Sequence, residues 1–379
     1  MTNKKLKILM LNYEFPPLGG GAANATKYIL KELSKNDNIS VDFVTSSTNT
    51  YREESFSNKI KIYFLDIGKK DNIHYQSNKD LLTYSFKALS FCKNLKKNNK
   101  YDLVHAFFGI PCGYIAMKLG MPYIVSLRGS DVPFYNKRFK LLDVLLFKKL
   151  SIKIWKKSNA VITNSEGLKN LALQTAPDQI ISVIYNGVDI EEFKPRVIES
   201  NIFTVISTSR LIKRKGIQYL IDGFIEFAKG KNDVKLIVIG DGNQKEELIS
   251  LVSENGEKDK IEFLGKINHD NLPKHYQSSD VFCLPSLNEG MSNALLEAMA
   301  SGLAILATDT GGTKELIDES NGIIIQKESK KAITDSLNLL YNNRDLLTKM
   351  GYNSRLKAET MSWKKCAEKY IETYGGVKN

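Results

Sequence analysis

Short apolar runs alternate along the chain with longer stretches whose apolar residues recur every three or four positions. The short runs are typical of buried strands and the longer stretches of amphipathic helices, and their regular alternation favours parallel sheets covered by helices. In the first half, strands are predicted at Leu6–Leu11, Val41–Thr45, Ile60–Leu65, Leu103–Phe107, Tyr123–Leu127, Ala160–Thr163 and Ile181–Tyr185. Helices are predicted between them at Ala22–Leu33, Asp80–Lys97, Ile110–Leu119, Leu141–Lys157 and Glu166–Thr175.

The alternation resumes after a polar stretch that contains a proline, residues 191–201, which we predict to be a linker. Strands are predicted beyond it at Phe203–Ser207, Val234–Ile239, Ile261–Leu264, Val281–Pro285, Leu303–Ala307 and Gly322–Ile325. Helices are predicted at Gly216–Ala228, Gln244–Glu254, Leu272–Gln277, Asn293–Ala300, Lys330–Tyr341, Arg344–Tyr352 and Trp363–Tyr374. Because 379 residues are too many for one ordinary core, we expect two Rossmann-like α/β domains, residues 1–190 and 202–359, with a cleft between them.

Composition narrows the class of protein. The hydrophobic fraction of 42% and the charged fraction of 25% are those of a soluble globular protein. The four cysteines have no CxxC or metal-ligand spacing and are expected to be reduced. No run approaches the about 18 apolar residues of a membrane span. These features predict a cytoplasmic protein.

Positive charge is concentrated in the first half. Residues 1–190 hold 28 Lys and Arg against 15 Asp and Glu, whereas residues 191–379 hold 26 against 27. A basic half can meet an anionic membrane face or acceptor, although a high lysine content also raises solubility. The chain lacks nucleic-acid-binding motifs, so nucleic acid is not expected as a partner. Residues 134–157 are especially basic, and they fit either a helix on anionic lipid or a buried helix whose lysines reach solvent.

Candidate ligand-binding groups gather where strands are followed by helices. Glu289 precedes the predicted helix Asn293–Ala300, and the N–H groups of Gly290, Met291 and Ser292 lie at its start, where anions bind. A carboxylate there can accept hydrogen bonds from hydroxyl groups, so a sugar phosphate or sugar nucleotide fits. Alternatively, Glu289 caps the helix and Glu297 is an exposed helix residue.

Two further loops carry charge. Arg210 and Lys215 follow the first strand of the second domain, where a basic loop is either a diphosphate site or simply solvated. Arg128 and Asp131 follow a strand of the first domain, where they form a structural ion pair or bind phosphate and sugar.

Glycine-containing turns complete the candidate site. Backbone at Gly240 and at Leu264, Gly265 and Lys266 ends two further strands of the second domain and is available to a ligand. Gly20 and Gly21 allow close backbone approach after the first strand. A nicotinamide dinucleotide enzyme is disfavoured because the second predicted strand ends in TSSTNT, without the ribose-binding acid.

Taken together, these motifs resemble family 4 glycosyltransferases, which are retaining, nucleotide-sugar-dependent enzymes of the GT-B fold. The matching segments are GGG at 19–21, RGSD at 128–131, NGVD at 186–189, RLIKRKG at 210–216, IGDG at 239–242, FLG at 263–265, EGMSNALLEAMASG at 289–302 and TGGTKEL at 310–316. The resemblance covers nearly the whole chain, and its most specific element is the carboxylate pair with seven residues between. It implies that residues 1–190 bind the acceptor, that residues 202–359 bind the donor, and that the tail, residues 360–379, returns to the first domain.

The resemblance also implies a role for each motif. Arg210 and Lys215 would hold the donor diphosphate, Glu289 the donor sugar, and Glu297 the ribose. Backbone at residues 264–266 would meet the base, and the loop at 20–21 would lie near the phosphates. Many relatives have His where this chain has Arg128, and also near the position of Phe107, so acceptor-side contacts differ here.

The predicted reaction is transfer of a hexose-type sugar, with retention, from a UDP- or GDP-linked donor to a glycan, lipid-linked or other hydroxyl acceptor, in cell-surface polysaccharide or glycoconjugate synthesis. No cofactor is expected. No metal is expected either, because the sequence has no DxD-like pair at a strand end and Arg210 and Lys215 can neutralise the leaving diphosphate. A nucleotide-sugar epimerase and a non-catalytic nucleotide-sugar-binding subunit stay open. Peripheral contact of the basic first domain with the inner membrane face is part of this hypothesis.

Overall fold

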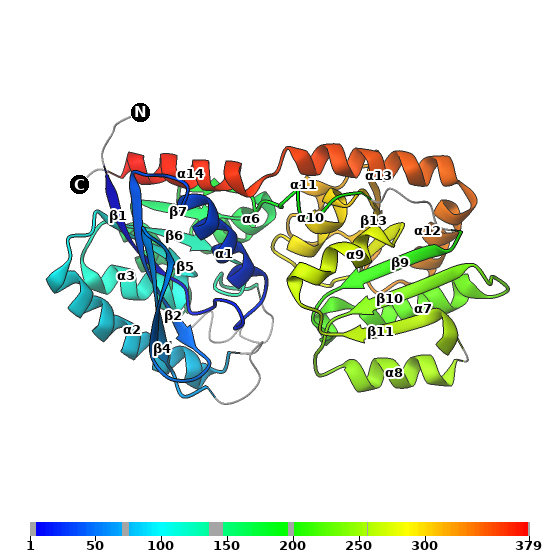
Figure 1. The fold of residues 1–379 in the computed structure, drawn as a ribbon, viewed down its shortest axis with the longest axis horizontal. Helices are drawn as coiled ribbons and strands as arrows, with labels where there is room; N and C mark the ends of the chain where they lie inside the picture. Colours follow the sequence, from blue (N-terminus) through cyan, green and yellow to red (C-terminus); the bar gives the residue numbers. More distant parts are fainter. Residues whose placement is uncertain (1–4, 70–75, 136–146, 196–200, 256, 378–379) are drawn as a thin grey trace. The chain divides into compact units, whose positions relative to one another are not determined.

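The computed structural model describes the chain except residues 1–4, 70–75, 136–146, 196–200, 256 and 378–379 (Figure 1). It divides into two compact units, Met1–Asn186 with Trp363–Asn379, and Gly187–Ser362. The chain passes between the units twice. Val188 and Met361 lie in the second unit, next to the two points where the chain crosses, and the N–H of Val188 donates to Met361 O at 2.9 Å. The start of the predicted linker, residues 191–195, lies in the second unit.

The first unit is built on an eight-stranded sheet among its described residues, in the order β3-β4-β2-β1-β5-β6-β7-β8. Its strands are β1 (Leu6–Leu11), β2 (Ile39–Ser47), β3 (Arg52–Ser57), β4 (Ile60–Asp66), β5 (Leu103–Phe107), β6 (Tyr123–Leu127), β7 (Ala160–Thr163) and β8 (Ile181–Val183). Its helices are α1 (Gly21–Leu33), α2 (Asn78–Asn98), α3 (Tyr114–Leu119), α5 (Lys148–Lys157), α6 (Glu166–Thr175) and α14 (Trp363–Gly376), with a π-type turn at Gly109–Gly113. Neighbouring strands are parallel except β3, which runs antiparallel to β4.

The second unit has a six-stranded parallel sheet among its described residues, in the order β11-β10-β9-β12-β13-β14. Its strands are β9 (Phe203–Thr208), β10 (Val234–Ile239), β11 (Ile261–Gly265), β12 (Val281–Leu284), β13 (Ala304–Thr308) and β14 (Gly322–Ile325). Its helices are α7 (Ile217–Ala228), α8 (Lys245–Glu254), α9 (Leu272–Gln277), α10 (Asn293–Ala300), α11 (Thr313–Leu316), α12 (Lys330–Asn342) and α13 (Arg344–Glu359), with 3-10 turns at Lys213–Lys215, Lys258–Lys260 and His269–Asn271.

Strand order in the second sheet marks the place where ligands of open α/β sheets generally bind. The chain proceeds outward from β9 to β10 and β11, then returns to place β12 on the other side of β9. Such a reversal separates the loops after the two central strands and opens a crevice at their carboxyl ends. The loop after β9 and the loop after β12 therefore flank the expected binding site of this unit.

The tail helix α14 belongs to the first unit, as the resemblance implies. It packs beside α1, where the rings of Tyr28 and Trp363 stack at 5.2 Å (Figure 1). Further along α14, the Tyr374 hydroxyl lies 2.8 Å from Nδ1 of the buried His105 in β5. Buried aromatic side chains therefore attach the end of the chain to the first sheet.

Two Rossmann-like α/β units confirm the predicted fold class, and most predicted strands and helices are present. The polar edge strand β3 was not predicted, and α13 extends beyond the predicted end at Tyr352. Part of the predicted helix Leu141–Lys157 lies outside the described residues, and the described part is α5. No described helix combines the length and the apolar character needed to cross a bilayer.

Candidate active site

The loop after β9 lies directly against the end of β12. Its basic residues form the 3-10 turn Lys213–Lys215, and Gly216, with a φ of +66°, is the N-cap residue of α7. A Cβ at Gly216 would lie 2.2 Å from the carbonyl oxygen of Pro285, so only glycine fits this contact. The N–H of Leu287 also donates to Arg214 O at 2.8 Å. The two loops that flank the strand-order reversal are thus fixed to each other by their backbones.

An ion pair between Lys215 and Glu289 lies where these loops meet. The Lys215 ammonium contacts Glu289 Oε1, and Ser286 Oγ donates to the same oxygen at 2.6 Å. The two side chains are only 12% and 10% exposed. Burial raises the pKa of Glu289, but the Lys215 charge and the hydrogen bonds from Lys215 and Ser286 more than offset it and leave that pKa below its usual value. Glu289 is therefore a carboxylate at neutral pH, next to a cation.

The start of α10 follows this pair. Ser292 caps the helix, since its hydroxyl accepts the N–H of Leu295 at 3.3 Å. The alternative in which Glu289 caps α10 is therefore wrong, and its carboxylate instead contacts Lys215 and Ser286. The loop from Glu289 to Ser292 presents buried backbone at Gly290 and Met291 next to the helix start.

Glu297 lies in α10 and is buried, not exposed as its alternative interpretation assumed. Its Oε1 lies 3.0 Å from Nε2 of His269, and its Oε2 accepts the hydroxyl of Tyr276 at 3.1 Å. Neither His269 nor Tyr276 was identified from the sequence, because both precede β12 and their contacts depend on how α9 packs against α10.

The turns after β10 and β11 adjoin the loop after β9. The N–H of Gly240 donates to Gly265 O at 2.8 Å, and a Cβ at Gly240 would lie 1.8 Å from Ser209 O. The N–H of Leu211 donates to Asp241 O at 2.9 Å. Backbone at residues 264–266, predicted to meet the base, is therefore connected through Gly240 to the loop that carries Arg210 and Lys215.

In the first unit, Asp131 is occupied by its own loop. Its carboxylate accepts the N–H groups of Gly109 at 2.6 Å, Arg128 at 2.9 Å and Gly129 at 3.0 Å. Burial raises its pKa, although these backbone donors lower it. Asp131 thus holds the loop after β6 against the turn after β5, which is a structural role other than the ion pair with Arg128, and its binding of a ligand stays a prediction.

Arg128 makes other contacts. Its Nη1 donates to Asn186 Oδ1 at 3.0 Å, and its guanidinium lies 5.0 Å from the centre of the Phe107 ring. Arg128 and Asp131 both lie in the described part of the chain, and they do not form the ion pair that one sequence alternative predicted. The Nε and Nη2 atoms of Arg128 are buried without a hydrogen-bond acceptor among the described residues. The two positions that depart from the family pattern, 107 and 128, therefore contact each other.

The remaining predicted residues of the first unit are Gly20 and Gly21. Gly20 precedes α1 as its N-cap, and its N–H lies 3.4 Å from Glu14 Oε2. Gly21 is the first residue of α1. Both glycines therefore lie at the start of the helix that follows β1, as the sequence predicts.

Two Rossmann-like α/β units in one chain are the architecture of the GT-B fold. The model for Glycosyltransferase Family 4 matches residues 19–192, and that for Glycosyl transferases group 1 matches residues 188–357. The two models together span most of the chain, which belongs to the family 4 glycosyltransferases.

One named relative is similar to this chain in sequence, and two solved structures are similar to it in fold. An N-acetylgalactosamine-N,N'-diacetylbacillosaminyl-diphospho-undecaprenol 4-alpha-N-acetylgalactosaminyltransferase from Campylobacter jejuni is 26% identical, over 75% of this chain and 78% of its own. The structure of sucrose-phosphate synthase from Thermosynechococcus elongatus has a TM-score of 0.85 at 18% identity, covering 98% of both chains. HepE from Anabaena, in complex with UDP-glucose, has a TM-score of 0.74 at 20% identity, covering 98% of this chain and all of that one.

Replacing Gly311 with Ala tests how closely the Glu289 loop must be placed. Gly311 has a φ of +49°, and a Cβ there would lie 2.1 Å from Glu289 O and 2.4 Å from Gly290 O. The variant must displace this loop, and a displacement near 1 Å costs up to about 100-fold in kcat/KM. Gly230→Ala is the matched control, because Gly230 has a φ of +72° and nothing within 4 Å. Equal activity of the two variants in a transfer assay would contradict the prediction.

Proposed function

We propose that the chain transfers a hexose-type sugar, with retention of anomeric configuration, from a UDP- or GDP-linked donor to a hydroxyl group. The observation that carries the proposal is the buried Lys215–Glu289 pair at the strand-order reversal of the second sheet. A cation next to a carboxylate at this place fits a ligand with both a diphosphate and hydroxyl groups. The UDP-glucose complex of HepE supports a nucleotide-sugar donor.

Negative charge grows on the leaving diphosphate as the glycosidic bond breaks, while the sugar ring becomes positive. Lys215 and Arg210, with the N-terminal end of α10, stabilise the negative charge on the leaving diphosphate. Glu289 accepts hydrogen bonds from sugar hydroxyls and places the ring for attack. Retention follows when the acceptor attacks from the side of the leaving phosphate, which takes the acceptor's proton.

A donor screen tests this function. Purified protein is mixed with UDP- and GDP-linked hexoses, and nucleotide release is measured with and without glycan or lipid-linked acceptors. Acceptor-dependent release, with the product's anomeric configuration retained in its nuclear magnetic resonance spectrum, is expected. Conversion of the donor sugar without acceptor would identify an epimerase, and binding without turnover across the whole screen would favour a non-catalytic subunit.

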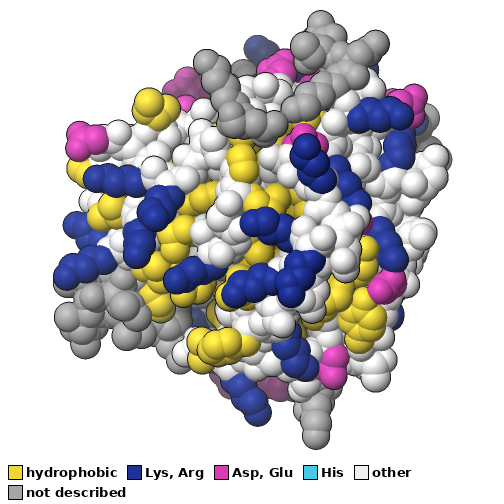
Figure 2. All heavy atoms as spheres, turned by 90° about the vertical axis from the view of Figure 1, so that its left-hand side faces the viewer, with side chains coloured by type: hydrophobic (Ala, Val, Ile, Leu, Met, Phe, Trp, Pro, Cys, Tyr) yellow, Lys and Arg dark blue, Asp and Glu magenta, His cyan; other side chains and the backbone are white. Residues whose placement is uncertain are grey.

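For the acceptor, we propose a lipid-linked glycan in cell-surface polysaccharide or glycoconjugate synthesis, at a membrane surface. The diphospho-undecaprenol named in the relative from Campylobacter supports this choice. The composition of α2 also supports it. This helix carries five lysines and one acidic residue, Asp80, whose carboxylate pairs with Lys69 at 2.8 Å. Phe86 and Leu82 lie one turn apart on α2 and are 74% and 61% exposed. Figure 2 faces the left-hand side of Figure 1, where α2 lies, and shows hydrophobic side chains among many Lys and Arg side chains and few acidic ones.

Replacing Leu82 and Phe86 together with Ser is expected to weaken binding to anionic vesicles about tenfold or more. Each side chain contributes on the order of 1 kcal/mol or more when its apolar surface leaves water, and nearby lysines add an electrostatic attraction that salt weakens. Co-sedimentation with phosphatidylglycerol vesicles measures it. Ile180→Ser is the control, since Ile180 is 86% exposed and lies outside α2. If the wild-type protein does not bind these vesicles at low salt, membrane contact is contradicted.

A further inference from the structure

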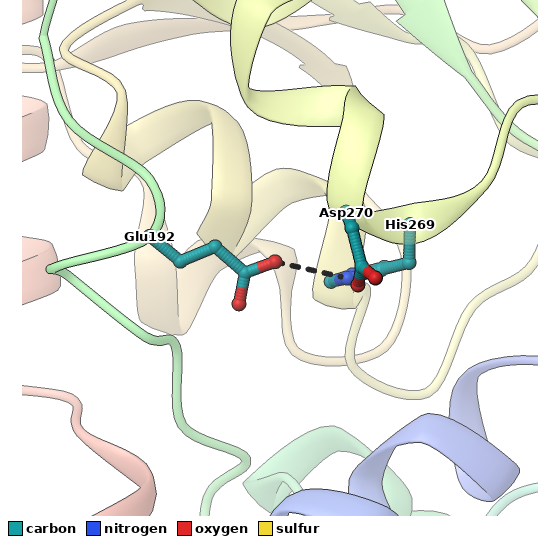
Figure 3. A group of neighbouring side chains, drawn as sticks. All are labelled: Glu192, His269 and Asp270. Carbon is teal, nitrogen blue, oxygen red and sulfur yellow. Dashed lines mark ion pairs between the residues drawn. The ribbon is translucent and has the colours of Figure 1, made fainter.

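His269 stands between two carboxylates of the second unit. It opens the 3-10 turn before α9, and its Nε2 lies 3.0 Å from Oε1 of the buried Glu297. On the other side of the ring, Nδ1 lies 3.4 Å from Oε1 of Glu192, a residue of the segment that leads into this unit (Figure 3). An imidazole that donates from Nε2 holds the Glu297 oxygen in one place.

The second oxygen of Glu297 is held from the opposite side. It accepts the hydroxyl of Tyr276, whose own oxygen lies 2.5 Å from Thr208 Oγ1 at the end of β9. Burial raises the pKa of Tyr276 well above its ordinary value, and the Glu297 charge raises it further. Tyr276 therefore stays protonated and donates to Glu297. Among the described residues, Oε2 has Tyr276 as a donor, and Oε1 has His269 when Nε2 carries the proton, so each oxygen keeps a lone pair for a further donor.

The ring of His269 is fixed by packing as well as by hydrogen bonds. The buried Phe193 meets it edge to face, with the ring centres 5.4 Å apart. Phe193 also packs against Tyr276 at 5.7 Å. One aromatic side chain thus supports both groups that hold Glu297.

We propose that His269 is a positioning residue that aims Glu297 at a vicinal diol, the 2′- and 3′-hydroxyls of the nucleotide ribose. This inference rests on the proposed function and on the ribose contact that the family resemblance implies for Glu297. Two fixed carboxylate oxygens match two neighbouring O–H donors, whereas a freely rotating carboxylate loses side-chain entropy when it binds them. Removal of His269 therefore weakens recognition of the 2′-hydroxyl without removing any group that contacts the sugar being transferred.

A bound cation is a rival explanation for the same residues. Ligand atoms of Glu192, His269 and Asp270 lie within 4.8 Å of one another, and Figure 3 shows the three side chains together. Asp270 is exposed and neighbours His269 in the same turn. Asp270→Asn therefore separates the two explanations, because it removes a cation ligand but leaves the contact between His269 and Glu297.

The test compares the affinities of UDP with 2′-deoxy-UDP, and of GDP with 2′-deoxy-GDP, by calorimetry. The ribose preference of the wild type is expected to fall about tenfold or more in Glu297→Gln, because hydrogen bonds to a charged acceptor are strong. His269→Ala and His269→Asn should match that loss. His269→Gln should recover much of it, since its amide nitrogen reaches the place of Nε2. In turnover, the alanine variant should raise the donor KM with little change in kcat.

Thermal melting of each variant checks that it is folded. An unchanged ribose preference in the His269 variants, with a reduced one in Glu297→Gln, overturns this inference and leaves the proposed function intact. Wild-type protein that binds neither UDP nor GDP overturns the proposed function and this inference with it. If a metal chelator abolishes the ribose preference of the wild type, or if Asp270→Asn lacks that preference, the effect belongs to a cation and the inference is also overturned.

Discussion

Lys215→Ala is expected to lower kcat/KM for the donor about 100- to 1000-fold, measured at a temperature where thermal melting shows the variant to be folded, because removing one partner of a buried pair also destabilises the protein. Lys215 is the largely buried cation at the strand-order reversal, and the loss of one preorganised group that stabilises transition-state charge has an effect of this size. The reason is that water, which replaces the ammonium, must reorient as the diphosphate leaves. Initial rates of nucleotide release, with the donor found in the screen, measure the change.

Two further variants make this prediction specific. Lys213 lies in the same 3-10 turn but is exposed, so Lys213→Ala should leave the rate within a few fold of wild type. Lys215→Arg keeps the charge but places a planar guanidinium in a site shaped for an ammonium, so it should recover only part of the rate. If Lys215→Ala and Lys213→Ala behave alike, Lys215 does not carry the charge stabilisation.

The fold was predictable because hydrophobic runs coincide with buried parallel strands. The bounds of β5, β6 and β7 follow directly from apolar runs that are buried on both faces. The edge strand β3 has the sequence REESFS, and its exposed charges give no such signal. It exists because it pairs with β4, a contact between segments that propensity alone does not specify.

The candidate site was predictable in its parts but not in its contacts. Sequence placed Lys215 and Glu289 at two strand ends, and a parallel sheet brings strand ends to one edge. That the two groups pair depends on β12 lying beside β9, which follows from strand order and not from local pattern. The same limit explains why Ser286, His269 and Tyr276 were missed. Whether these residues bind a donor stays a prediction.

Asp131 illustrates a different limit. One of the two sequence alternatives pairs it with Arg128, but its carboxylate accepts backbone N–H groups of its own loop and of the turn after β5. Backbone donors at a tight turn compete with side-chain partners for a short carboxylate. Arg128 then contacts Asn186 and Phe107 instead.

Glu289→Leu is expected to destabilise the second unit by about 3–5 kcal/mol, since it leaves the Lys215 ammonium buried without its carboxylate. Combining it with Lys215→Met should restore much of that loss, because two apolar side chains can fill the space of a buried ion pair. Chemical denaturation measures both. The control is Glu262→Leu, whose exposed pair with Lys235 is worth less than about 1 kcal/mol.

Activity should separate from stability in this series. The double variant has neither the cation for the diphosphate nor the carboxylate for the sugar, so its rate should stay at least about 1000-fold below wild type although its stability returns. A pair kept only for structure would give the opposite result, with activity recovering alongside stability. Recovery of transfer by the double variant would therefore remove the Lys215–Glu289 pair from the mechanism, whatever donor the screen identifies.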